Sequence, residues 1–71
     1  MYDYRKLSGR ITEICGTQYN FAKKINLSER TVSLKLSGKV EFKQGEITKA
    51  CKILQIEENE ISDYFFKQIV Q

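Results

Sequence analysis

Apolar residues recur in this chain at intervals of three and four, and no proline interrupts the pattern. Leu7, Ile11 and Ile14 show this spacing near the start of the chain. Residues spaced in this way share one face of an α-helix, so each such segment predicts a helix with one buried stripe. Strand-like alternation is confined to residues 40–42, a stretch too short to found a sheet, and is expected to be a loop. The sequence therefore predicts an all-α fold.

Short polar and glycine signals mark the boundaries of the expected helices. The Asp3 carboxylate is placed to cap free amides at the start of the first helix, and Gly16 is placed to end it. Thr17 and Ser28 are capping residues for the next two helices, and Asn26 suits the sharp turn between them. The expected helices cover about residues 4–15, 18–24, 29–36 and 44–54, followed by a short fifth helix within 57–70.

The length of 71 residues limits the chain to one domain of about the smallest size that folds without cross-links, so a single domain over residues 1–71 is expected to carry the function. Hydrophobic residues form 41% and charged residues 30%, a balance typical of globular proteins. The apolar stretches fall far short of the roughly 20 residues of a membrane span, and the N-terminal stretch lacks a secretory core. We expect a cytoplasmic protein with no membrane partner.

The chain has two cysteines, Cys15 and Cys51, and no histidine. A zinc site would need unusual ligands or a second chain, so we expect no metal and no cofactor. Both cysteines lie on apolar stripes and are expected to pack in the core. There is also no glycine-rich phosphate loop and no carboxylate pair on one buried face. These features predict that the protein is not an enzyme and has no small-molecule substrate.

Charge is unevenly distributed along the chain, which carries a net charge of +3. The middle holds Lys23, Lys24, Arg30, Lys35, Lys39 and Lys43, and the end holds Glu57, Glu58, Glu60 and Asp63. The modest excess of positive charge decides little by itself. Its concentration in the middle indicates an anionic partner for that region.

The segment 17–39 has the pattern of a helix-turn-helix, in which two short helices are separated by a turn of fixed length. Such a unit needs a small residue where its helices cross, a turn residue that tolerates positive φ, and an apolar plug after the turn. Ala22, Asn26 and Leu27 meet these needs in order, and Val32 and Leu36 are expected to anchor the second helix. The unit is expected at about residues 17–38.

These residues resemble the Cro and C1 repressor-like helix-turn-helix family of temperate phages and bacteria. Thr17-Gln18 is similar to the family's opening of the second helix, Leu27-Ser28 to its turn exit, and Ser37-Gly38-Lys39 to the asparagine-glycine-lysine that often follows the recognition helix. Residues 61–66 also resemble the end of short Cro-type proteins from phages of Gram-positive hosts. The resemblance implies a five-helix bundle of the lambda-repressor-like type and a regulator that works in a bacterial host cell.

Two positions depart from the family pattern. Asn26 stands where glycine is usual, and this change is tolerated because asparagine accepts positive φ. Lys35 stands at a position that is often apolar, so anchoring is expected to shift to Leu36, with the lysine stem along the edge of the core.

Candidate DNA contacts follow if the third helix enters the major groove. The residues expected to face bases are Glu29, Arg30, Ser33 and Leu34, and those expected at phosphates are Thr17, Gln18, Lys35, Lys39 and Lys43. Arg30 can pair with O6 and N7 of guanine, and Glu29 can accept from a cytosine amine. Leu34 either contacts a thymine methyl group or simply packs against its neighbours.

Two functions remain open at this point. The first is a Cro-like transcription regulator that reads double-stranded operator DNA in a phage lysis-lysogeny switch, where a homodimer would supply a second recognition helix. The second is a modulator, or antirepressor, that acts through a hetero-complex with a phage repressor. Glu29 in the reading position and surplus apolar surface at Leu34 and residues 64–69 favour a protein partner.

Overall fold

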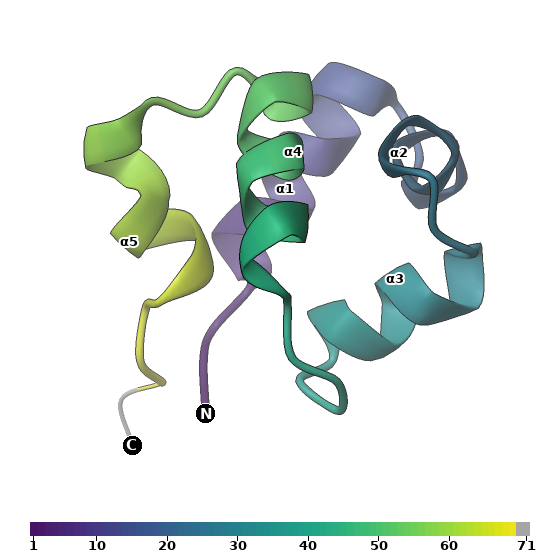
Figure 1. The fold of residues 1–71 in the computed structure, drawn as a ribbon. Helices are drawn as coiled ribbons and strands as arrows, with labels where there is room; N and C mark the ends of the chain where they lie inside the picture. Colours follow the sequence, from purple (N-terminus) through teal and green to yellow (C-terminus); the bar gives the residue numbers. More distant parts are fainter. Residues whose placement is uncertain (70–71) are drawn as a thin grey trace.

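The computed structural model describes residues 1–69 and contains five α-helices in that range (Figure 1). They are α1 (Arg5–Cys15), α2 (Gln18–Ile25), α3 (Glu29–Leu36), α4 (Gln44–Leu54) and α5 (Ile61–Phe65), with a single 3₁₀ turn, η1 (Glu58–Glu60), immediately before α5. The described residues include no named strand, only one isolated bridge between the chain ends. The all-α class is confirmed.

The start and end of α1 follow local signals in the sequence. The Asp3 carboxylate accepts a hydrogen bond from the Arg5 amide at 2.9 Å, as expected of a residue at the start of a helix. Gly16 closes the helix at φ 84, a left-handed conformation that is unfavourable for residues with a Cβ atom. Thr17 then caps α2 by accepting from the Asn20 amide at 3.0 Å. The two helices therefore meet at a tight corner.

Residues 26–28 form a short turn between α2 and α3. Asn26 adopts φ 64, and the Leu27 amide donates to the Ala22 carbonyl at 3.0 Å. Leu27 packs against the core, as expected of a plug. Figure 1 views α2 nearly along its axis while α3 lies across the view, so the two helices cross at a steep angle. The turn thus directs one face of α3 away from the bundle.

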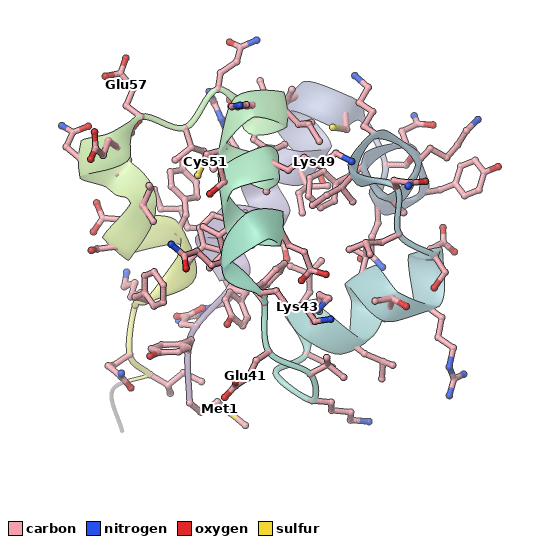
Figure 2. The ribbon with its side chains drawn as sticks, viewed as in Figure 1. Met1, Glu41, Lys43, Lys49, Cys51 and Glu57 are labelled. Carbon is pink, nitrogen blue, oxygen red and sulfur yellow. The ribbon has the colours of Figure 1, made fainter. Side chains whose placement is uncertain are left out.

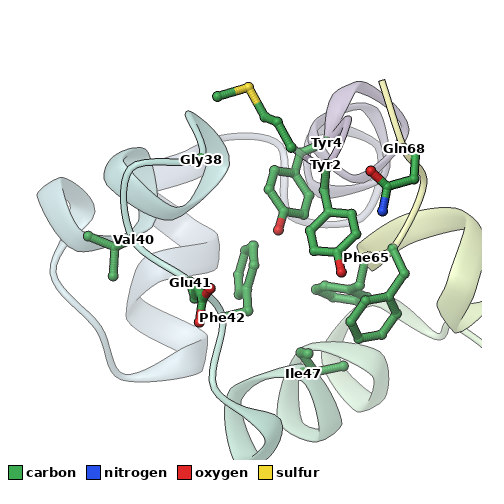
Figure 3. Close-up of a pocket in the computed structure, with 11 residues that line it drawn as sticks. Tyr2, Tyr4, Gly38, Val40, Glu41, Phe42, Ile47, Phe65 and Gln68 are labelled. Carbon is green, nitrogen blue, oxygen red and sulfur yellow. The ribbon is translucent and has the colours of Figure 1, made fainter. Parts of the chain in front are cut away.

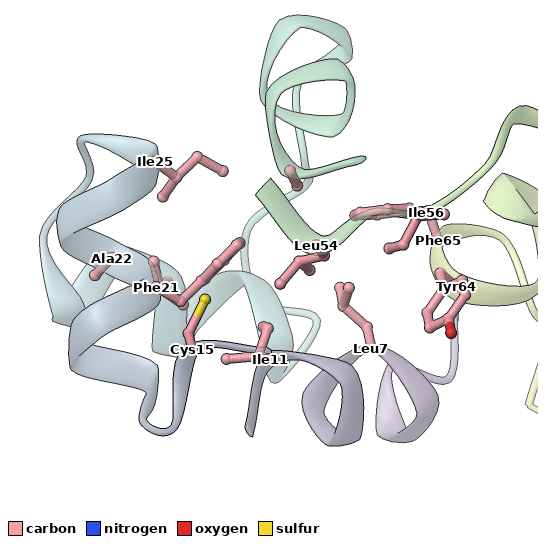
Figure 4. Close-up of a cluster of buried hydrophobic side chains, with 12 residues drawn as sticks. Leu7, Ile11, Cys15, Phe21, Ala22, Ile25, Leu54, Ile56, Tyr64 and Phe65 are labelled. Carbon is pink, nitrogen blue, oxygen red and sulfur yellow. The ribbon is translucent and has the colours of Figure 1, made fainter. Parts of the chain in front are cut away.

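The core lies between α1, α2, α4 and α5 (Figure 4). Its buried members are Leu7, Ile11, Cys15, Phe21, Ala22, Ile25, Val32, Ala50, Leu54, Ile56, Tyr64 and Phe65. Burying a large apolar side chain contributes about 1.5–3 kcal/mol, so residues such as Phe21 and Phe65 supply much of the driving force for folding. Helix α3 contributes only Val32 to this cluster, which leaves most of its surface on the outside.

The short fifth helix expected within residues 57–70 is present as α5. It ends at Phe65, and the residues after it run beside the N-terminal segment. The Asp3 amide donates to the Lys67 carbonyl at 2.7 Å, and the Ile69 amide donates to the Met1 carbonyl at 3.2 Å. These long-range bonds replace further helical ones. Val70, the last residue of the expected segment, lies outside the described residues.

Across residues 1–69, every helix is too short or too polar to span a lipid bilayer.

Candidate interaction surface on helix α3

A shallow hollow of about 470 Å³ opens on the outer face of α3. It is lined by Gln18, Glu29, Arg30, Ser33, Leu34 and Lys39, and we call it the α3 hollow. Gln18 comes from the start of α2, Lys39 from the loop after α3, and the remaining residues from α3 itself. The structure therefore gathers all four residues predicted to contact bases with two of the residues predicted to contact phosphate.

The charged side chains of the α3 hollow point to solvent. Glu29, Arg30, Ser33 and Lys39 are exposed, whereas Gln18 and Leu34 are half-buried. Within residues 1–69, none of Glu29, Arg30 and Lys39 takes part in an ion pair. The hollow thus presents two cations, one carboxylate and a partly exposed leucine to a partner.

Both ends of α3 are held by local hydrogen bonds. Ser28 accepts from the Thr31 amide at 3.0 Å and so caps the first turn. At the other end, the Leu34 carbonyl accepts from the Lys39 amide at 3.0 Å and from the Val40 amide at 3.3 Å. These last bonds fold the loop back on α3 and place Lys39 at the rim of the α3 hollow.

Lys35 does not lie where a phosphate contact requires it, and this part of the prediction is wrong. Its side chain is buried, with 2% of the residue surface exposed. The Lys35 ammonium pairs with Glu46 Oε1 at 2.8 Å and donates to the Glu41 carbonyl at 2.8 Å. Lys35 follows Val32 by three positions and shares its inward face, so the helix turns this lysine toward α4.

The expected anchoring at Leu36 holds only in part, since Leu36 does pack against the core. Leu36 is only half-buried, and Val32 together with the stem of Lys35 forms the buried side of α3. A lysine is accepted there because its ammonium finds both a carboxylate and a carbonyl inside the protein. The whole Lys35 side chain is therefore buried, whereas the sequence suggested that only its stem would lie along the edge of the core.

Glu46 is a residue that sequence reasoning does not single out. Its Oε1 also accepts from the Lys43 amide at 2.9 Å, so it caps α4 while it pairs with Lys35. Partial burial works to raise the pKa of Glu46, but the Lys35 ammonium and the Lys43 amide hold that pKa below its ordinary value. Its position three residues after the cap of α4, combined with a lysine at a usually apolar position, was the available signal.

Two other predicted phosphate contacts, Thr17 and Lys43, are exposed but do not line the α3 hollow. Thr17 uses its hydroxyl oxygen to cap α2. Lys43 and Glu41 lie on the segment that enters α4, and Glu57 lies at the opposite end of the molecule (Figure 2).

A second hollow, of about 450 Å³, lies where the N-terminal segment meets the C-terminal segment and the loop before α4 (Figure 3). Its walls are largely aromatic, and Phe42 makes edge-to-face contacts with Tyr4 and Phe65, each at 5.3 Å between ring centroids. Only part of the surplus apolar surface expected at residues 64–69 is exposed. Tyr64 and Phe65 are buried, while Phe66 and Ile69 are each 45% exposed.

The cysteines serve the core, as expected. Cys15 is buried, Cys51 is half-buried against the same cluster, and both are free thiols. Burial raises the pKa of the Cys51 thiol, which disfavours the reactive thiolate. Among residues 1–69 no group of three or more candidate metal ligands occurs.

Comparison with known families decides where the chain belongs. The family described as protein of unknown function DUF739 matches residues 1–68. The chain is a member of the DUF739 family. No curated protein matches the sequence.

Among solved structures, this DUF739 protein is similar to the modulator of repression (MOR) of the temperate bacteriophage TP901-1 from Lactococcus lactis, determined in solution. The two are 56% identical, with a TM-score of 0.82, and the match covers 99% of this chain and 95% of that chain. The resemblance to phage regulators of repression is confirmed at this level. Membership of the Cro and C1 repressor-like family stays a prediction.

Proposed function

We propose that this DUF739 protein is a modulator of repression that acts by binding a partner repressor protein, rather than by reading DNA alone. The observation that carries the proposal is the 56% identity to the TP901-1 modulator over 99% of this chain. Such a protein works in the cytoplasm of a bacterial host and performs no catalysis. Its partner is a repressor, and its effect is to change how strongly that repressor acts.

The composition of the α3 hollow supports a protein partner. Glu29 is exposed at the start of α3, where a helix in the major groove would hold it among phosphates and repel them. Leu34 is half-buried and offers apolar area, which a protein side chain covers well. A repressor surface with donors for Glu29, acceptors for Arg30 and an apolar group for Leu34 complements this face.

Direct DNA binding is the second candidate function, and the convergence of Gln18, Arg30 and Lys39 on one hollow favours it. In this case α2, the turn and α3 form a DNA-binding helix-turn-helix. Arg30 then pairs with guanine, Ser33 and Leu34 contact neighbouring bases, and Gln18 and Lys39 contact phosphates. A single module of this size binds DNA tightly only with a second copy, so this function includes a homodimer on operator DNA.

Co-purification tests the proposal. The tagged protein is co-expressed with a phage repressor taken from the same genome, and this repressor is expected to copurify at a fixed ratio. Leu34→Asp is expected to abolish the complex, because it places a charge in the α3 hollow. Ile69→Asp is the matched control: it adds the same charge at an exposed apolar residue outside the α3 hollow and is expected to leave the complex intact.

Three results would count against this assignment. A wild-type protein that fails to retain the repressor, yet shifts a promoter fragment specifically at low salt, supports the DNA function instead. Loss of the complex in Ile69→Asp but not in Leu34→Asp would move the repressor site to the surface around Ile69. A wild-type protein that binds neither the repressor nor the promoter would reject both functions.

A further inference from the structure

The buried ammonium of Lys35 meets three partners inside the protein. It pairs with Glu46 Oε1 at 2.8 Å, donates to the Glu41 carbonyl at 2.8 Å and lies 5.8 Å from the centroid of the Phe42 ring. An ammonium has three N–H donors, and a ring face within about 6 Å attracts a cation. The ammonium therefore has an ionic, a hydrogen-bonding and an aromatic partner, and these come from two successive parts of the chain, residues 41–42 and α4.

A purely apolar residue at position 35 would fill the same volume without fixing its neighbours. Replacing buried ion pairs by apolar residues is often neutral or stabilising, so stability alone does not account for a charge here. Unlike an apolar residue, this lysine forms a directional hydrogen bond. Its bond to the Glu41 carbonyl holds the loop backbone at one point relative to α3.

That loop carries a residue of the candidate interaction surface. Lys39 lines the α3 hollow, and its amide donates to the Leu34 carbonyl. Leu34 and Lys35 are consecutive, so neighbouring positions of α3 hold the same loop, one at its start and the other at Glu41. Gly38, at φ 83, lets the chain turn between α3 and the loop.

We propose that Lys35 is a positioning residue, whose buried bond to the Glu41 carbonyl fixes the loop of residues 38–43 and thereby holds Lys39 at the rim of the α3 hollow. The inference concerns the geometry of the free protein. It rests on the proposed function only where a repressor partner is used as a readout.

Amide hydrogen exchange measured by NMR tests the positioning without any partner. The double variant Lys35→Met/Glu46→Gln removes the ammonium and leaves no orphaned carboxylate. We expect the Lys39 and Val40 amides to exchange at least about tenfold faster than in the wild type, while core amides such as that of Ile11 keep their rates. Glu46→Gln alone is the matched control, because Lys35 still donates to the Glu41 carbonyl; it is expected to leave Lys39 protected.

Two outcomes of this experiment would overturn the proposal. One is unchanged exchange at Lys39 and Val40 in the folded double variant. The other is a uniform acceleration across α1 and the loop, which indicates global destabilisation only. If the double variant does not fold, the exchange rates of the wild type provide the test. A fixed loop is rejected if the wild-type Lys39 and Val40 amides exchange as fast as those of an unstructured peptide.

A double-mutant cycle with the repressor then separates positioning from simple stability. In the wild-type background, Lys35→Met/Glu46→Gln is expected to weaken repressor binding about fivefold, and in a Lys39→Ala background less than about twofold, because the residue being positioned is gone. Equal weakening in both backgrounds would reject action through Lys39. If neither the wild type nor any variant binds the repressor, the proposed function is contradicted. The positioning role of Lys35 is then tested by the hydrogen-exchange experiment alone.

Discussion

Arg10 Nε donates a hydrogen bond to the Leu54 carbonyl at 2.9 Å and so ties the middle of α1 to the end of α4. Leu54 is the last residue of α4, where carbonyl groups have no partner within the helix. Arg10 also donates to the Gln55 carbonyl at 3.3 Å, and its guanidinium pairs with Glu13. The Arg10 side chain, which projects from α1, thus supplies hydrogen-bond donors to carbonyl groups at the end of α4.

Arg10→Met is therefore expected to lower the free energy of unfolding by about 1–2 kcal/mol, because the carbonyl groups at the end of α4 lose a charged donor. Chemical denaturation followed by circular dichroism measures the change. Glu13→Gln, which weakens only the exposed ion pair, serves as the control and is expected to change stability by less than about 0.5 kcal/mol. An equal loss in both variants would show that the Leu54 bond has no special role.

Asn26 offers a test of the turn between α2 and α3. Its φ of 64 lies in the left-handed region, which asparagine tolerates and alanine does not. Asn26→Ala is expected to destabilise the protein by about 1 kcal/mol, whereas Asn26→Gly is expected to be neutral within about 0.5 kcal/mol. For a domain of this size, about 1 kcal/mol corresponds to a fall of roughly 4–8 °C in Tm. Equal Tm values for the two variants would contradict this account.

The pairing of Glu46 with Lys35 predicts a dependence of stability on pH. The folded protein holds the pKa of Glu46 below its ordinary value of 4.5. The stabilisation linked to this carboxylate is therefore fully present above that ordinary value and is lost as the pH falls through the lower pKa of the folded state. Acid unfolding curves of the wild type and Glu46→Gln are expected to converge as the pH falls below 4.5. Parallel curves over the whole range would show that Glu46 titrates as it does in the unfolded chain.

Arg30 and Lys39 separate two modes of DNA contact if the second candidate function holds. Arg30→Ala is expected to relax base preference at one position of a bound site. Lys39→Ala is expected to weaken all sequences alike and to reduce the salt slope of binding by about 1. Fluorescence anisotropy with duplexes of varied sequence, measured across salt concentrations, distinguishes the two effects. If neither substitution alters binding, direct readout by the α3 hollow is rejected.

Most of the helical framework could be predicted from the sequence because it depends on neighbours along the chain. The spacing of Leu7, Ile11 and Ile14, the caps at Thr17 and Ser28 and the turn at Asn26 each involve residues within about one helical turn of one another. The bounds of α3 and α4 were predicted correctly for this reason. Local hydrogen bonds and helix periodicity are sufficient to locate such elements.

The exposed face of α3 was also predictable, because helical periodicity separates its outer residues from Val32. The sequence thus identified Glu29, Arg30, Ser33 and Leu34 as a common face. Gln18 and Lys39 were expected at phosphates, but helical periodicity did not determine that they border this face. Gln18 and Lys39 reach the α3 hollow because of the steep crossing of α2 and α3 and the loop bonds to Leu34.

Tertiary structure alone decided the roles of Lys35 and the chain ends. Lys35 has the sequence character of a surface cation, yet Glu46 and the Glu41 carbonyl make its burial acceptable, and both lie beyond its own helix. Likewise, residues after Phe65 leave the helix because Met1 and Asp3 offer backbone partners from the opposite end of the chain. The sequence determined the helices and their outward faces through local interactions, whereas long-range hydrogen bonds decided which charge is buried and where the last helix ends.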